Sequence, residues 1–123
     1  MSKTILVVED QEDNRQILRD LLGASGFEMR EAGDGEAALA EVARQRPDLI
    51  LMDIQLPVLD GYEATRRLKA NPDTKGIPII VVTSYALSGD ESKARASGCD
   101  AYVTKPYSPR ALLAKIKEFL PQP

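Results

Sequence analysis

The sequence contains no histidine and only one cysteine, Cys99. Any mechanism that needs an imidazole from this chain is therefore excluded, as are a histidine-ligated zinc site and an internal disulfide bond. A single thiol is typical of proteins in a reducing compartment, so we expect a cytoplasmic protein.

Long apolar runs and blocks of basic residues are also missing. No stretch approaches the roughly 20 apolar residues of a membrane span, and the N-terminus lacks a signal peptide, so we expect no membrane insertion. With a formal net charge of −3, the chain is not expected to bind nucleic acid directly. Its 123 residues suit one domain with a core from about residue 4 to residue 120, and we expect no effector domain after it.

Short β-branched runs alternate along the chain with segments of helical spacing. The runs lie at Thr4–Val8, Phe27–Glu31, Asp48–Met52, Ile77–Thr83 and Ala101–Thr104, and the first helical stripe comprises Ile17, Leu18, Leu21 and Leu22. Several runs are apolar on both faces, as parallel strands covered by helices must be. Five strand–helix units in one small domain predict an α/β fold with a doubly wound parallel sheet, because a barrel needs eight such units.

Polar residues stand at the ends of four of the five expected strands. In open α/β sheets, ligands bind beyond the carboxyl ends of the strands. Two unit charges about 5 Å apart repel by roughly 3 kcal/mol at an effective dielectric constant near 20, and a divalent cation removes that penalty. An all-oxygen ligand set with few carboxylates suits Mg²⁺ best. The residues are Glu9 and Asp10 after the first run, Asp53 after the third, Thr83 at the end of the fourth and Lys105 after the fifth.

An aspartate beside such a metal can act as a nucleophile toward a phosphoryl group. Lys105 would then neutralise the transferred oxygens, and the Thr83 hydroxyl would form a hydrogen bond with them. Any one aspartate after a strand is more often a helix cap, and a single lysine is more often a solvated surface residue. The prediction therefore depends on the joint pattern and not on any one residue.

Four segments resemble the receiver domain of bacterial two-component response regulators. They are EDQ at 9–11, MDIQLPVLDGYE at 52–63, VVTSYA at 81–86 and YVTKP at 102–106. The resemblance extends from Thr4 to about Leu120 and is strongest to stand-alone receivers of the cell-cycle and phosphorelay type. It implies a CheY-like, flavodoxin-like fold with strand order 2-1-3-4-5 and helices on both faces of the sheet.

The resemblance also implies a phosphoacceptor and a metal site. Asp53 would receive a phosphoryl group from a histidine of a partner, either a sensor histidine kinase or a histidine phosphotransfer protein. Mg²⁺ would be held by Asp10 and Asp53 directly, by Glu9 through water, and by the backbone carbonyl of Gln55. Such a chain is a signalling module and not a turnover enzyme, because it phosphorylates itself and then loses its own phosphoryl group.

Further residues would couple phosphorylation to a partner. Thr83 would move toward the phosphoryl group, Tyr102 would turn inward, and Lys105 would pair with the phosphate, followed by a cis peptide bond to Pro106. A downstream protein, not identified by the sequence, would bind the face formed by the fourth helix, the fifth strand and the fifth helix. The fourth helix, expected at 86–97, has few apolar residues and should be held weakly against the sheet.

Gln55 and Tyr85 flank the path of attacking water in proteins of this kind. An aromatic ring at Tyr85 should screen the phosphoryl group, so we expect slow self-hydrolysis.

Two alternative functions stay open from the sequence. A Mg²⁺-dependent phosphatase with an aspartyl-phosphate intermediate would usually carry a D-x-D motif after the first strand, which this chain lacks. A flavin carrier of the same topology would need amides or hydroxyls where the first turn is acidic.

Overall fold

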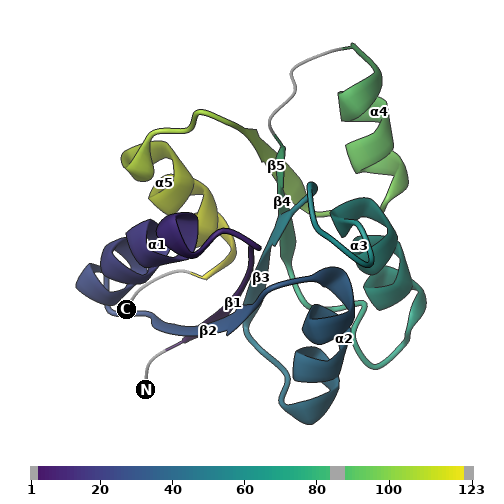
Figure 1. The fold of residues 1–123 in the computed structure, drawn as a ribbon, viewed down its shortest axis with the longest axis horizontal. Coiled ribbons are helices and arrows are strands. Elements are labelled where there is room, and N and C mark those ends of the chain that lie inside the picture. Colours follow the sequence, from purple (N-terminus) through teal and green to yellow (C-terminus); the bar gives the residue numbers. More distant parts are fainter. Residues whose placement is uncertain (1–2, 84–87, 121–123) are drawn as a thin grey trace.

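Strands and helices alternate through the computed structural model, which describes residues 3–83 and 88–120 (Figure 1). Tyr85 lies outside the described residues. The elements are β1 (Thr4–Val8), α1 (Glu12–Ala24), β2 (Glu28–Ala32), α2 (Gly35–Arg44), β3 (Leu49–Asp53), α3 (Gly61–Ala70), β4 (Ile79–Thr83), α4 (Ser88–Ala96), β5 (Ala101–Thr104) and α5 (Pro109–Phe119).

The five strands form one parallel sheet in the order β2-β1-β3-β4-β5. This confirms the doubly wound α/β fold and the strand order implied by the resemblance. Because every strand runs in the same direction, all the carboxyl ends meet at one edge of the sheet. β1 and β3 are direct neighbours, which brings the residues that end these two strands together.

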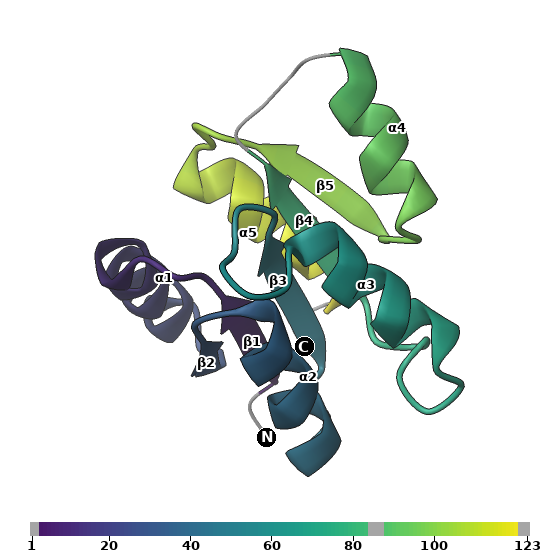
Figure 2. The ribbon, with the colours of Figure 1, turned by 45° about the vertical axis from the view of Figure 1, so that its right-hand side comes forward.

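Helices cover both faces of the sheet (Figures 1 and 2). Alternate strand residues pack into opposite layers. Leu6 and Val8 of β1 pack with α2 and α3, whereas Ile5 and Val7 pack with α1 and α5. All four side chains are at most 1% exposed. Burial of both faces explains why the strands are apolar throughout and not alternating.

Side-chain caps start three helices immediately after the loops that follow the strands. The Oδ1 of Asp34 accepts a hydrogen bond from the backbone N–H of Ala37 at 2.7 Å, and Asp60 caps α3 in the same way. Ser108 caps α5, which has Pro109 at its first position. These caps satisfy backbone donors at the start of each helix.

Several sequence expectations need adjustment. The second and fourth strands cover Glu28–Ala32 and Ile79–Thr83, and not 27–31 and 77–83. The third strand covers Leu49–Asp53 and not 48–52, because the parallel ladder continues through a bond from the backbone N–H of Ile54 to the carbonyl of Val82 at 3.1 Å. In α1, Leu18 and Leu22 are buried, but Ile17 is 58% exposed. Successive helical residues are rotated by about 100°, so the apolar stripe is wider than the face that meets the sheet.

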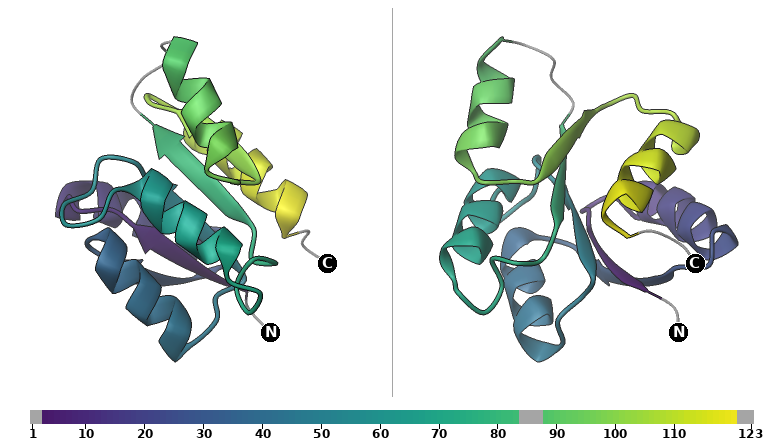
Figure 3. Two further views of the ribbon diagram at one scale, coloured as in Figure 1. Left: turned by 90° about the vertical axis from the view of Figure 1, so that its right-hand side faces the viewer. Right: turned by 180° about the vertical axis from the view of Figure 1, so that it is seen from behind.

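The α4 helix adds little to the core. Among its side chains that the structure describes, at positions 92–96, only Ala94 is buried. Figure 3 shows α4 at one end of the layer that it forms with α2 and α3. Across the described part of the chain, no helix is long and apolar enough to span a membrane.

Candidate functional site

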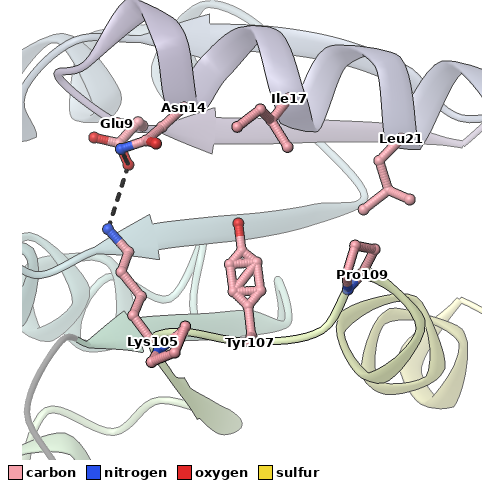
Figure 4. A pocket seen from close by; sticks show the side chains of 8 residues that line it. Glu9, Asn14, Ile17, Leu21, Lys105, Tyr107 and Pro109 are labelled. Carbon is pink, nitrogen blue, oxygen red and sulfur yellow. Dashed lines mark hydrogen bonds and ion pairs between the residues drawn. The ribbon is translucent and has the colours of Figure 1, made fainter.

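Two buried carboxylates and a lysine meet at the carboxyl edge of the sheet. Glu9 follows β1 and is 4% exposed, and Asp53 ends β3 and is 5% exposed. The Nζ of Lys105, which follows β5, lies 2.9 Å from Oδ2 of Asp53 and 3.5 Å from Oε1 of Glu9. Figure 4 shows the lysine side chain extended toward Glu9. The topology thus joins residues from three loops in one ion-paired cluster.

The carboxylate of Asp53 is held in a single orientation. Its Oδ1 accepts a hydrogen bond from the backbone N–H of Gln55 at 3.1 Å, while Oδ2 contacts Lys105. Gly61, the first residue of α3, lies so close to the strand end that a Cβ there would stand 2.1 Å from the carbonyl oxygen of Asp53. Only glycine fits at this close approach between α3 and β3.

Asp10 and Asn14 complete the cluster around Glu9. One carboxylate oxygen from each of Glu9, Asp10 and Asp53 lies within 4.8 Å of the others. Glu9 accepts hydrogen bonds from the backbone N–H of Gln11 at 3.1 Å and from Nδ2 of Asn14 at 3.3 Å. Asn14 was not predicted from the sequence. Its position in the first turn of α1, beside the end of β1, was the only available signal.

The cluster carries more negative charge than its surroundings compensate. Burial, followed by the hydrogen bond and negative charge of Asp53, raises the pKa of Glu9 from 4.5 to about 7. Burial acts to lower the pKa of Lys105, but the hydrogen bond and charge of Asp53, with the charge of Glu9, outweigh it and raise that pKa. Three carboxylate oxygens within 4.8 Å of one another fit a small, hard divalent cation such as Mg²⁺.

The other predicted residues lie at or near the same edge. Thr83 ends β4 and is 2% exposed, and its carbonyl accepts a hydrogen bond from the backbone N–H of Lys105 at 2.6 Å. The Lys105–Pro106 peptide bond is cis, as the resemblance implied. Tyr102 of β5 is partly buried and packs against the core layer of α2 and α3.

An apolar pocket of about 520 Å³ opens from this cluster between α1 and the segment that leads into α5 (Figure 4). Exposed Ile17, which was predicted to belong to the core stripe, forms part of its wall. The ends of the pocket differ in chemistry, with charged side chains at the sheet edge and apolar ones along α1. Its lining comprises Glu9, Asn14, Ile17, Leu21, Lys105, Pro106, Tyr107 and Pro109.

Comparison with known proteins agrees with this geometry. Residues 5–117 match the response regulator receiver domain family. The chain is 45% identical over 120 residues to the polar-differentiation response regulator DivK of Brucella anthropi, covering 98% of each chain. It superposes with a TM-score of 0.93 on a putative response regulator from Chloroflexus aurantiacus, at 30% identity and covering 99% of this chain and 100% of that one.

A third relative bears on the metal. The receiver domain of a sensor histidine kinase from Pseudomonas aeruginosa has a TM-score of 0.91 and 35% identity, with 99% of this chain and 100% of that chain covered. Its crystal structure has a magnesium ion coordinated in the active-site cleft. The chain described here belongs to the response regulator receiver domain family, and it is a receiver module of two-component signalling.

Proposed function

We propose that Asp53 accepts a phosphoryl group from a phosphohistidine of a partner protein. The main support is the buried Asp53 carboxylate, placed among the carboxylates of Glu9 and Asp10 with Lys105 at 2.9 Å. The chain has no histidine, so the donor imidazole has to come from a sensor histidine kinase or a histidine phosphotransfer protein.

In the proposed transfer, a carboxylate oxygen of Asp53 attacks phosphorus and the N–P bond of the donor breaks. The leaving imidazole nitrogen keeps the electron pair, so no other reactant is needed. The Nζ of Lys105 then pairs with a phosphoryl oxygen, and the hydroxyl of Thr83 forms a hydrogen bond to another. The chain provides its own catalytic groups and acts once per phosphorylation, as a signalling module and not a turnover enzyme.

Glu9, Asp10, Asp53 and the backbone carbonyl of Gln55 would hold Mg²⁺. When bound, the ion supplies positive charge that balances the carboxylates and the transferred phosphoryl oxygens. The raised pKa of Glu9 supports this assignment, because a bound cation would favour the ionised form of this buried carboxyl.

Phosphorylation would change the face formed by α4, β5 and α5, which would bind a downstream protein or allow the phosphoryl group to be passed on. A hydrogen bond from the N–H of Lys105 to the carbonyl of Thr83 links the ends of β4 and β5 and would carry a movement of Thr83 to β5. Tyr102, which is partly buried on β5, would respond by turning inward. The weakly packed α4 is the element on this face that moves at lowest cost.

The pocket beside Glu9 and Lys105 is the proposed contact for the donor protein. It leads from the cluster along the exposed apolar side chain of Ile17, which suits an amphipathic helix carrying the phosphohistidine. Ile17→Ser should slow phosphorylation by a partner kinase. The same variant should react with a small phosphodonor at the wild-type rate, because Ile17 lies away from the reacting carboxylate.

The lifetime of the phosphorylated protein tests the proposed roles of Gln55 and Tyr85. Gln55 is exposed two residues after Asp53, where it can approach water at the phosphoryl group. We expect slow loss of phosphate from the purified protein, and faster loss when Tyr85 is replaced by alanine. A wild-type lifetime of only seconds would contradict the proposed screening by Tyr85.

The central experiment is incubation with a small phosphodonor, with and without Mg²⁺, followed by intact mass measurement. Wild type should gain one phosphoryl group only with Mg²⁺, and Asp53→Asn should gain none. Asp20→Asn, which changes an exposed aspartate of α1, is the matched control and should react like wild type. Labelling of Asp53→Asn would exclude Asp53 as the acceptor. Steady turnover of a generic phosphate ester would instead indicate a phosphatase.

A further inference from the structure

Arg15 lies in the first turn of α1, and its side chain turns back toward the sheet. Its Nη1 donates a hydrogen bond to the backbone carbonyl oxygen of Glu9 at 2.7 Å. The side chain is only 20% exposed, which is low for an arginine on a surface helix. The guanidinium therefore contacts the main chain directly beside the acidic cluster, without contacting a carboxylate of that cluster.

The same guanidinium binds two further segments. Its Nε lies 3.1 Å from Oε1 of Glu31 on β2, and its Nη2 lies 2.7 Å from Oε2 of Glu12 on α1. Arg15 thus joins the end of β1, the end of β2 and the start of α1. The charge of Arg15 is already paired with the two glutamates. The main effect of its bond to the carbonyl of Glu9 is therefore to orient that peptide group.

We infer that Arg15 is a positioning residue for the cation site. The carbonyl of Glu9 belongs to the peptide group that links Glu9 to Asp10. Arg15 therefore fixes the orientation of the peptide plane between the two residues that carry these carboxylates. This inference rests on the proposed function, in which these two residues hold Mg²⁺. Groups that orient metal ligands from outside typically change affinity by about 10–100-fold when they are removed.

Arg19 provides a matched control one turn further along α1. It binds the same two glutamates, with Nη2 lying 2.7 Å from Glu31 and 3.2 Å from Glu12. Its Nη1 donates to the side chain of Gln16 at 2.6 Å, whereas the corresponding atom of Arg15 donates to the carbonyl of Glu9. Replacing either arginine removes one positive charge and two ion pairs, but only the replacement of Arg15 releases the Glu9 carbonyl.

The experiment compares Mg²⁺ dissociation constants, measured by titration calorimetry, for wild type, Arg15→Gln, Arg15→Lys and Arg19→Gln. Arg15→Gln should bind Mg²⁺ about tenfold more weakly, at the lower end of the range for such positioning groups. Arg19→Gln should bind like wild type. Arg15→Lys should fall between them, because lysine keeps the charge but loses the planar set of donors that spans three partners.

Urea unfolding of the metal-free proteins separates positioning from general loss of stability. We expect the two glutamine variants to be destabilised to a similar extent while only Arg15→Gln loses Mg²⁺ affinity. If Arg15→Gln does not fold, the comparison of Arg15→Lys with Arg19→Gln decides the question. Equal Mg²⁺ affinity in the Arg15 and Arg19 variants would overturn the inference and leave the proposed function intact. A wild-type protein that binds no Mg²⁺ would overturn both.

Discussion

The buried carboxyl of Glu9 should make the metal-free protein less stable as the pH rises toward neutrality. Its pKa is about 7 in the folded protein, against 4.5 for an unperturbed glutamate. Between these two values the folded chain binds more protons than the unfolded chain, so each rise in pH favours unfolding. At about 1.4 kcal/mol per pKa unit, the whole shift corresponds to an upper limit of roughly 3–4 kcal/mol for the loss of stability.

The other shifted glutamates and Lys105 titrate outside this range, so they do not mask the loss of stability caused by Glu9. The pKa values of Glu12 and Glu41 are lowered by hydrogen bonds to arginines, chiefly Arg15 and Arg44 respectively. These two glutamates therefore stabilise the folded protein at pH values above the ordinary glutamate pKa. Their stabilisation is lost only as the pH falls below that value. The raised pKa of Lys105 acts in the alkaline range.

The assay is urea unfolding followed by far-ultraviolet circular dichroism, in the presence of a chelator, between about pH 5 and about pH 8. Wild type should lose stability across this interval, while Glu9→Gln, which cannot ionise, should stay nearly constant. Added Mg²⁺ should abolish the loss for wild type, because the ion binds the ionised carboxylates of the folded state. Stability of the metal-free wild type that is constant or rising from pH 5 to 7 would refute the reasoning.

Three substitutions test other parts of the structure by the same unfolding assay. Gly61→Ala should lower the free energy of unfolding by more than about 2 kcal/mol, because its Cβ would lie 2.1 Å from the carbonyl oxygen of Asp53. Gly23→Ala should instead stabilise α1 by up to about 1 kcal/mol, because a Cβ there would have no atom within 4 Å. An equal effect of the two would contradict the close approach. Val58→Gly should stabilise the protein by about 1 kcal/mol. Val58 is 80% exposed and has a φ of 69°, which is a strained conformation for a β-branched residue. A loss of stability in this variant would exclude such strain. Leu112→Ala should cost about 2–5 kcal/mol, because this leucine is fully buried between α5 and the sheet, and a negligible change would show that the site can collapse around the smaller side chain.

Much of the fold could be predicted because its signals are local. A strand such as Thr4–Val8 is marked by β-branched residues, and the start of α5 is marked by Ser108 and Pro109, whose effects act within a few residues. The order of the strands is different. Every central strand is apolar on both faces, so composition does not say which strands pair, and only the family resemblance implied the order that the structure shows.

The candidate site could be predicted in part for the same reason. Glu9, Asp10 and Asp53 were found because each stands at the end of a strand and all parallel strands end at one edge. Asn14 and Arg15 were missed as supports of Glu9, because a polar residue on a helix looks the same in sequence whether it faces water or a strand end. Ile17 was placed in the core for the converse reason, since periodicity does not give the width of the buried face.

The sequence by itself determined the alternation of strands and helices, the oxygen-bearing side chains of the candidate site and the lack of histidine among its residues. These follow from backbone preferences and from residue types, both of which are properties of short segments. The sequence placed Lys105 and Asp53 at one edge of the sheet, but only the tertiary structure decided their direct contact at 2.9 Å and the bond from Arg15 to the carbonyl of Glu9. Such contacts depend on how the packed layers place whole strands and helices beside one another, which no local pattern specifies.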